Sequence, residues 1–191
     1  MAERAVFLDR DGVITVDSGY THRIEDFQLV PGSAQGLSLL QHDGWRLVVV
    51  TNQSGIARGL YTDDDYQRFT THMRAQLAAH GVRLDAVLHC PHLPDATVVQ
   101  YRRRCDCRKP APGMLLRAAH ELSLDLQASV MVGDRLSDVQ AGRAAEVGRC
   151  LLVRSGQPLR DSDGPMADAV YDDLAACAKA IVSPIGTNPR R

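Results

Sequence analysis

Residues 5–12 read Ala-Val-Phe-Leu-Asp-Arg-Asp-Gly, and this stretch decides the fold. Its four apolar residues predict a short buried strand, which places Asp9 and Asp11 at the carboxyl end of that strand. Ligands of open parallel sheets bind at this end. Two carboxylates there can hold Mg²⁺, and one of them can attack a phosphoryl group. The alternative is a solvated Asp-x-Asp-Gly turn, and three later segments decide against it.

Short β-branched runs alternate with helical patterns along the rest of the chain. We expect strands at 5–9, 46–51, 85–89, 129–133 and 149–153. We expect helices near 33–43, 63–80, 112–122, 137–146 and 172–182. This alternation predicts a Rossmann-like α/β fold, in which a parallel sheet lies between two helical layers. Segments 10–32 and 90–111 are too long for simple connections, and long structured loops are usually functional.

The composition is that of one globular domain, with 191 residues, 45% apolar and 24% charged. We expect a single domain over residues 1–183, with the loop 90–107 inserted in it, and a flexible tail over 184–191. The net charge of −1 gives no sign of a basic surface for binding nucleic acid. No apolar run approaches the ~20 residues of a membrane span. The start of the chain leaves no room for a signal peptide. We therefore expect a cytoplasmic monomer with no nucleic-acid or membrane partner.

The second polar segment, Thr51 to Ser54, follows a predicted buried strand. Its hydroxyl and amide groups can donate hydrogen bonds to phosphate oxygens without adding charge. By itself, the pattern is also typical of a polar turn that caps the next helix.

The third segment contains Lys109, one of only two lysines in the chain. It precedes Pro110-Ala111-Pro112, a rigid start to the third predicted helix. A lysine there adds a point charge to amides that already favour anions. An isolated lysine is otherwise a solvated surface cation.

The fourth segment follows the strand at 129–133 and contains Asp134 and Asp138. Asp134 can supply a third oxygen ligand to a cation, whereas Asp138 either caps the next helix or contacts the metal. Because the carboxyl ends of parallel strands lie along one edge of a sheet, all four segments would meet there. Together they would supply the nucleophile, acid/base group, phosphate donors, cation and metal that phosphoryl transfer requires.

Three cysteines and one histidine form a separate cluster, with the sequences Cys90-Pro91-His92 and Cys105-Asp106-Cys107. Three thiolates and one imidazole match a closed structural zinc site, although buried free cysteines are the alternative. His89 competes with His92 as the fourth ligand, but it lies in the strand expected at 85–89, so we favour His92. Such a site would fold the loop 90–107 and orient Lys109, which lies two residues after it.

The four segments, in this order and over most of the chain, resemble the motifs of the haloacid dehalogenase-like phosphatases. With the cysteine pattern they resemble the histidinol-phosphatase-like branch of that family. The resemblance implies that Asp9 is the nucleophile that forms an aspartyl-phosphate and that Asp11 is the general acid and base. It also implies Mg²⁺ bound by the side chains of Asp9 and Asp134 and by the backbone carbonyl of Asp11. Lys109 would stabilise the phosphoryl group, and the phosphate or substrate would contact Thr51, Asn52, Gln53 and Ser54.

The same resemblance implies substrate contacts elsewhere. The segment Asp17-Ser18-Gly19-Tyr20 would help to bind the substrate, and Arg108 would recognise a second phosphate. At position 135 the family pattern has Lys and this chain has Arg, so that Arg135 keeps the charge of a substrate contact but changes its reach. No part of the chain has room for a large cap domain.

We therefore expect an Mg²⁺-dependent phosphatase, stabilised by Zn²⁺, whose substrate is a small doubly phosphorylated sugar. The alternatives are a histidinol-phosphate phosphatase, a polynucleotide 3′-phosphatase and a non-catalytic binding module stabilised by zinc. A histidinol-phosphate phosphatase would share every catalytic residue. It would differ only in how it recognises the part of the substrate far from the phosphate that is removed. The second is disfavoured by the absence of a basic groove.

Overall fold

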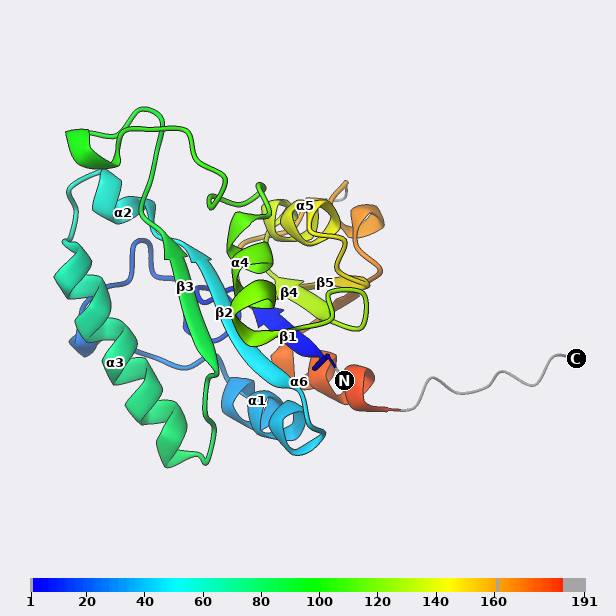
Figure 1. Cartoon of the computed structure of the whole chain (residues 1–191). Helices are drawn as coiled ribbons and strands as arrows, with labels where there is room; N and C mark the ends of the chain where they lie inside the picture. Colours follow the sequence, from blue (N-terminus) through cyan, green and yellow to red (C-terminus); the bar gives the residue numbers. More distant parts are fainter. Residues whose placement is uncertain (1, 161, 184–191) are drawn as a thin grey trace, which may run out of the picture.

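The structure is a computed structural model that describes residues 2–160 and 162–183, and the expected tail 184–191 lies outside the described residues. Its centre is a six-stranded sheet in the order β3-β2-β1-β4-β5-β6 (Figure 1). All neighbouring strands are parallel. The strands are β1 (Ala5–Leu8), β2 (Arg46–Asn52), β3 (Ala86–Cys90), β4 (Val130–Gly133), β5 (Arg149–Val153) and β6 (Ala169–Tyr171).

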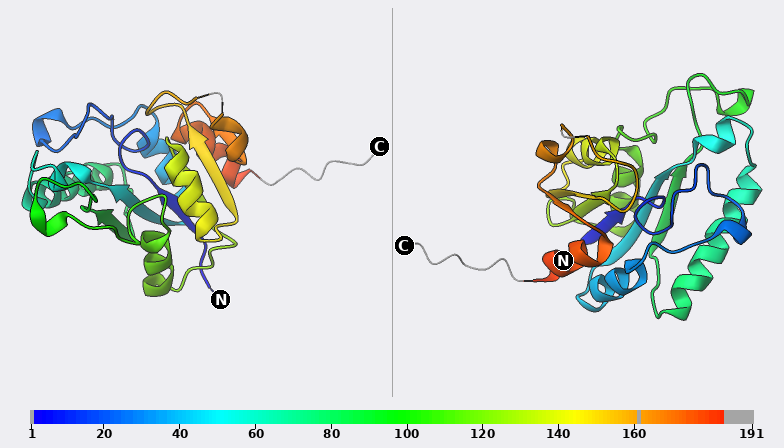
Figure 2. Two further views of the ribbon diagram at one scale, coloured as in Figure 1. Left: turned by 90° about the horizontal axis from the view of Figure 1, so that it is seen from above. Right: turned by 180° about the vertical axis from the view of Figure 1, so that it is seen from behind.

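Helices cover both faces of this sheet, which confirms the three-layer α/β prediction (Figure 2). One face packs against α1 (Ser33–His42), α3 (Asp63–Ala79) and α6 (Leu174–Val182). The other face packs against α4 (Gly113–Leu122) and α5 (Leu136–Ala144). The remaining helical elements are short: α2 (Ser54–Ala57) and the 3₁₀ turns Ile24–Asp26, Val99–Tyr101 and Gly164–Met166.

Strand β1 shows how the sequence builds two cores. Val6 and Leu8 face the first helical layer, while Ala5 and Phe7 face the second, and all four side chains are fully buried. Successive side chains of a strand point to opposite faces, so a strand covered on both sides is apolar throughout. The continuous apolar run before Asp9 is therefore the signature of a central parallel strand.

All the expected strands and helices are present, and two further short elements were not predicted. Strand β6 has three residues, all half-buried at the edge of the sheet, and α2 is a single turn. Helix α3 begins as its acidic first turn predicts, with a capping box between Thr62 and Asp65. A cap of this kind stabilises a helix by about 1 kcal/mol.

The strand order places the functional loops. The chain runs from β1 outward to β2 and β3, and then returns to the other side of β1 for β4, β5 and β6. The order therefore reverses between β1 and β4, and open α/β sheets bind ligands outside such a switch point. The loop after β1 carries Asp9 and Asp11, and the loop after β4 carries Asp134.

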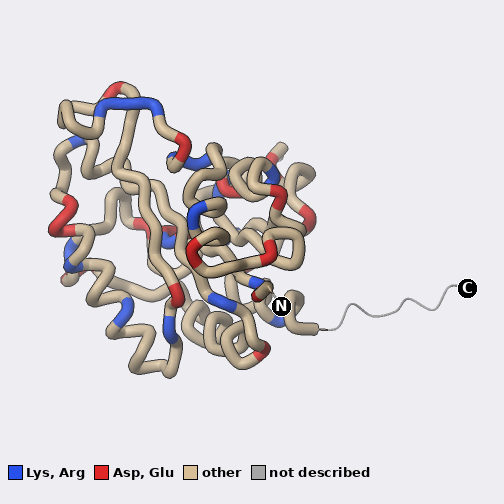
Figure 3. The backbone as a smooth tube through the Cα atoms, viewed as in Figure 1, with Lys and Arg blue, Asp and Glu red and all other residues tan. Residues whose placement is uncertain are grey.

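The cysteine loop, defined as residues 90–107, rises from the end of β3 above this edge (Figure 1). Acidic and basic residues are mixed along the backbone, and the basic run 102–104 is exposed on the outer part of the cysteine loop (Figure 3). None of the helices in the described residues is long and apolar enough to cross a membrane.

Candidate active site

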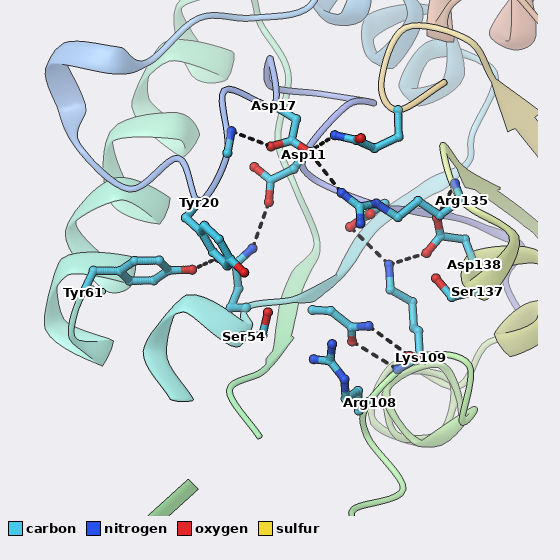
Figure 4. Close-up of a pocket in the computed structure, with 15 residues that line it drawn as sticks. Asp11, Asp17, Tyr20, Ser54, Tyr61, Arg108, Lys109, Arg135, Ser137 and Asp138 are labelled. Atoms are coloured by element: carbon cyan, nitrogen blue, oxygen red, sulfur yellow. Dashed lines mark hydrogen bonds and ion pairs between the residues drawn. The ribbon is translucent and has the colours of Figure 1, made fainter. Parts of the chain in front are cut away.

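A cavity of about 400 Å³ opens at the carboxyl edge of the sheet (Figure 4). It gathers residues from segments that are far apart in the sequence, as the strand-end argument predicts. Most of the predicted site residues line it, whereas Thr51, Ser18 and Asp134 lie outside the lining. The lining residues are Asp9, Asp11, Asp17, Gly19, Tyr20, Asn52, Gln53, Ser54, Tyr61, Arg108, Lys109, Arg135, Ser137, Asp138 and Gln157.

Lys109 is buried beside Asp9. Its Nζ lies 3.1 Å from Asp9 Oδ1 and 2.7 Å from Asp138 Oδ1, and donates a hydrogen bond to the carbonyl of Val50 at 2.7 Å. Burial lowers the pKa of Lys109, but the charges of Asp138 and Asp9 outweigh burial and the net shift is upward. The ammonium group therefore stays charged where a phosphoryl group on Asp9 would need it.

The backbone of Lys109 is held by Asn52. The side-chain oxygen of Asn52 accepts a hydrogen bond from Lys109 N, and its amide nitrogen donates one to Lys109 O, both at 3.0 Å. An asparagine amide that faces a backbone in this way fixes both position and direction. Asn52 thus fixes the backbone of Lys109 at the cavity.

Three carboxylates, those of Asp9, Asp134 and Asp138, offer oxygen atoms within 4.8 Å of one another. Asp134 is 1% exposed. Its Oδ2 accepts a hydrogen bond from the backbone N–H of Gln157 at 2.8 Å, while its Oδ1 is buried without a hydrogen-bond partner among the described residues. Burial and the neighbouring Asp9 raise the pKa of Asp134 to about 7. A buried carboxylate oxygen without a partner, inside an all-oxygen donor set, fits a hard divalent cation such as Mg²⁺.

Asp138 makes the helix-cap contact that its sequence position allows, and its other carboxylate oxygen lies in the carboxylate cluster. Its Oδ2 accepts a hydrogen bond from the backbone N–H of Arg135 at 3.0 Å at the start of α5, while Oδ1 pairs with Lys109. Gly133 makes this approach possible, because a Cβ atom there would lie 2.2 Å from Asp138 Oδ2. Asp138 is therefore both a helix cap and a member of the carboxylate cluster.

Asp11 stands apart from that cluster. Arg10, which is 1% exposed, binds both of its carboxylate oxygens, with Nε at 3.0 Å and a terminal nitrogen at 2.9 Å. Gln53 Nε2 donates a third hydrogen bond to Asp11 at 3.0 Å. Burial raises the pKa of Asp11 despite the opposing charge of Arg10.

Gln53 connects Asp11 to the cavity wall. Its Oε1 accepts a hydrogen bond from the hydroxyl of Tyr61 at 2.6 Å, and its Nε2 also donates to Thr51 Oγ1 at 2.8 Å. The carboxamide of Gln53 thus makes its hydrogen bonds with protein groups. Its predicted contact with substrate phosphate stays a prediction, as do those of Asn52 and Ser54.

The segment 17–20 forms another wall of the cavity. Asp17 Oδ1 accepts a hydrogen bond from Gly19 N at 3.0 Å. Its Oδ2 lies 3.1 Å from Arg135 and accepts a hydrogen bond from Gln157 Nε2 at 2.7 Å. Tyr20, with a left-handed φ of 55°, is 45% exposed.

Arg108 is a cation of the cavity that forms no ion pair with the described residues. Its guanidinium donates to the carbonyl of His92 at 3.3 Å and has no ion-pair partner in the described part of the chain. Arg135, by contrast, is paired with Asp17. The two arginines, both labelled in Figure 4, are therefore not equivalent as anion-binding groups.

Sequence analysis missed four residues of the site: Arg10, Tyr61, Ser137 and Gln157. Arg10 stands between the two predicted carboxylates, and its extreme burial gives no signal in the sequence. Gln157 follows β5 at the same edge as the other site segments, so the strand-end rule applied to the fifth strand would have found it.

The cysteine loop brings its four predicted ligands together. The Sγ atoms of Cys90, Cys105 and Cys107 lie 3.2–3.5 Å apart, and His92 Nδ1 is 3.3 Å from Cys107 Sγ. The cysteines are free thiols. Zinc–sulfur bonds of about 2.3 Å place the corners of a tetrahedron roughly 3.8 Å apart, a little wider than here. This donor set fits a zinc ion in a closed site.

His89 is not part of this cluster. Its Nε2 lies 2.9 Å from Asp63 Oδ1, and its ring packs against that of Tyr66 at a tilt of 32°. The choice of His92 over His89 therefore agrees with the geometry. At the other end of the cysteine loop, Asp106 O accepts a hydrogen bond from Gly113 N at 2.9 Å. This hydrogen bond anchors the end of the cysteine loop to the start of α4. Arg108 and Lys109 lie between the two residues that form it.

Comparison with known proteins identifies the family. A protein from Photorhabdus laumondii named D-glycero-beta-D-manno-heptose-1,7-bisphosphate 7-phosphatase is 49% identical over 177 residues, 93% of this chain and 94% of that protein. A protein of the same name from Escherichia coli K12 is 48% identical over 93% of each chain. A family model described as HAD-hydrolase-like matches residues 106–177. The chain belongs to the haloacid dehalogenase-like hydrolases.

Solved structures of this hydrolase family confirm the fold. The crystal structure of D,D-heptose 1,7-bisphosphate phosphatase from B. bronchiseptica, complexed with magnesium and phosphate, matches with a TM-score of 0.79 at 34% identity. The match covers 94% of this chain and 98% of that chain. A haloacid dehalogenase-like phosphatase structure from Mesorhizobium loti matches with a TM-score of 0.81 at 33% identity, over 99% of this chain and 90% of that chain. The resemblance drawn from the sequence motifs is confirmed.

Proposed function

We propose that this haloacid dehalogenase-like hydrolase is an Mg²⁺-dependent phosphatase that removes the C7 phosphate of D-glycero-D-manno-heptose 1,7-bisphosphate. One observation carries the choice of a bisphosphate. Lys109 is paired with Asp9 and Asp138, while Arg108, the next residue, lines the same cavity and has no ion-pair partner among the described residues. The names of the relatives, at 48–49% identity, support the same substrate.

The side chains support a two-step reaction. A carboxylate oxygen of Asp9 attacks phosphorus, and the bond to the sugar oxygen breaks as Asp11 donates a proton to that oxygen. Water then attacks the aspartyl-phosphate while Asp11 accepts a proton from it, which releases phosphate and restores Asp9. Mg²⁺, bound by Asp9, Asp134 and the backbone carbonyl of Asp11, would supply charge neutralisation of the phosphoryl oxygens. Lys109 would add a second positive charge, and Thr51, which accepts a hydrogen bond from Gln53, would support the phosphate-binding turn.

Distal recognition supports the sugar bisphosphate over histidinol phosphate. Arg108 would bind the C1 phosphate through a charge-assisted pair, which the amine of histidinol cannot form. The segment Asp17-Ser18-Gly19-Tyr20 and Arg135 would enclose the sugar.

We further propose that Cys90, His92, Cys105 and Cys107 bind a structural zinc ion that orients Arg108 and Lys109. Residues 1–183 would then act as one cytoplasmic, monomeric phosphatase domain. Its product would enter the synthesis of nucleotide-activated heptose for the lipopolysaccharide core.

A phosphate-release assay tests the proposal. The panel contains both anomers of the heptose bisphosphate, histidinol phosphate and fructose 1,6-bisphosphate. We expect release of one phosphate per heptose bisphosphate, dependent on Mg²⁺, with the highest kcat/KM of the panel. The Asp9→Asn variant is the control, since it should be folded, retain zinc and be inactive. Equal or faster turnover of histidinol phosphate would overturn the substrate assignment.

A further inference from the structure

The segment that follows β5, residues 155–157, packs against two of the site loops. Ser155 Oγ donates a hydrogen bond to the carbonyl of Gly12 at 2.7 Å, and Gln157 N donates one to Asp134 Oδ2 at 2.8 Å. A Cβ atom at Gly156 would lie 2.2 Å from Asp134 Oδ2, so only glycine permits this approach. The segment is therefore built into the carboxylate cluster, although none of the four motifs includes it.

The side chain of Gln157 points in a defined direction. Its Nε2 donates a hydrogen bond to Asp17 Oδ2 at 2.7 Å, where Arg135 also binds. The other oxygen of Asp17 accepts from Gly19 N. Both carboxylate oxygens of Asp17 are therefore engaged with protein donors, and Asp17 serves to orient Gln157 and Arg135.

The contact with Asp17 uses only one of the hydrogen-bonding groups of the Gln157 side chain. Its Oε1 and second Nε2 hydrogen have no hydrogen-bond partner among the described residues, and the half-buried side chain lines the cavity. A carboxamide presents an acceptor and a donor side by side. That pair matches two neighbouring hydroxyl groups of a sugar.

We propose that Gln157 is a specificity-determining residue that binds hydroxyl groups of the substrate. The proposal rests on the proposed function, since it takes a phosphorylated sugar as the substrate. Because the backbone of Gln157 contacts Asp134, its side chain lies near the phosphoryl end of the cavity. The hydroxyls it binds are therefore those close to the phosphate that is removed. Arg108, which would recognise the distal phosphate under the proposed function, lies across the site from Asp17, the residue that holds the Gln157 side chain (Figure 4).

The test uses Gln157→Met, which retains the length of the side chain and the backbone N–H but loses the amide. We expect kcat/KM for heptose bisphosphate to fall about tenfold, mainly through KM, as for the loss of one hydrogen bond to a substrate. The loss on p-nitrophenyl phosphate, which has no hydroxyl groups, should be several-fold smaller. Gln35→Met makes the same chemical change at an exposed position of α1 and is the matched control.

A second pair of substrates keeps the inference separate from the proposed function. Glycerol 3-phosphate and propyl phosphate differ only in hydroxyl groups. We expect the wild-type protein to prefer the former and Gln157→Met to lose that preference. If the wild-type protein hydrolyses these phosphates but not heptose bisphosphate, the proposed function falls and the preference still decides the role of Gln157. Equal losses on all substrates, or no loss, would overturn the role of Gln157 in specificity.

Discussion

Replacing Lys109 by Met should destabilise the protein strongly in the absence of Mg²⁺. The side chains of Lys109 and Asp138 are each 1% exposed, and Nζ also lies 3.1 Å from Asp9 Oδ1. Removing the cation leaves three carboxylates within 4.8 Å of one another. Breaking a buried ion pair at one partner costs about 3–5 kcal/mol, because the remaining charge is buried and unpaired.

We therefore expect the free energy of unfolding at pH 7 to fall by about 3–5 kcal/mol, equivalent to a Tm lower by about 6–20 °C for a chain of this size. Urea unfolding measures this change and can be monitored by the fluorescence of Trp45, the single tryptophan. Trp45 is 8% exposed in the folded protein, so unfolding exposes it to water. Saturating Mg²⁺ should reduce the deficit, because a cation then neutralises the carboxylates. Phosphatase activity should stay at least about 100-fold below wild type, since the charge beside the phosphoryl group is still missing.

Two further variants make this reasoning refutable. Lys109→Met/Asp138→Asn removes both partners of the buried pair and should recover at least about 2 kcal/mol relative to the single variant. Arg117→Met breaks an exposed pair with Glu121 and should cost less than about 1 kcal/mol. If Lys109→Met costs no more than Arg117→Met, or if the double variant is no more stable than the single one, the electrostatic account of this cluster is wrong.

Three other outcomes follow from the site. A strong chelator should remove zinc, as measured by atomic absorption, and should lower both Tm and kcat. Adding Zn²⁺, but not Mg²⁺, should restore the zinc content, Tm and kcat. Unchanged stability without zinc would contradict a structural site. Arg108→Ala should raise KM for heptose bisphosphate about tenfold or more relative to its effect on p-nitrophenyl phosphate, and equal effects on both would remove Arg108 from distal recognition. Tyr61→Phe deletes the 2.6 Å hydrogen bond to Gln53, which holds Asp11. Steady-state kinetics should show kcat lowered about three- to tenfold with little change in KM; the reverse split would place Tyr61 in substrate binding instead.

Local sequence pattern was sufficient for five of the six strands and for the carboxylates and Lys109 at the sheet edge, whereas residues 17–20, Arg108 and Arg135 came from the family resemblance. An apolar run followed by Asp9 or Asp134 marks the end of a buried parallel strand, because the sheet is covered on both faces and its carboxyl edge is open to ligand. The spacing of Cys90, His92, Cys105 and Cys107 likewise predicted the ligand cluster that the structure brings together. Strand β6 escaped detection because three half-buried residues at a sheet edge carry little hydrophobic signal.

The partners of the polar side chains were decided only by the tertiary structure. Asn52 and Gln53 looked alike in the sequence, yet Asn52 binds the backbone of Lys109, 57 residues away, and Gln53 joins Asp11 to Tyr61. Asp17 meets Gln157 across 140 residues. Burial makes an unpaired polar group costly, so each of these groups is bound by whichever partner the packing of distant loops supplies. The chain by itself therefore determined which chemical groups reach the edge of the sheet, and the fold determined which of them remain free to meet a substrate.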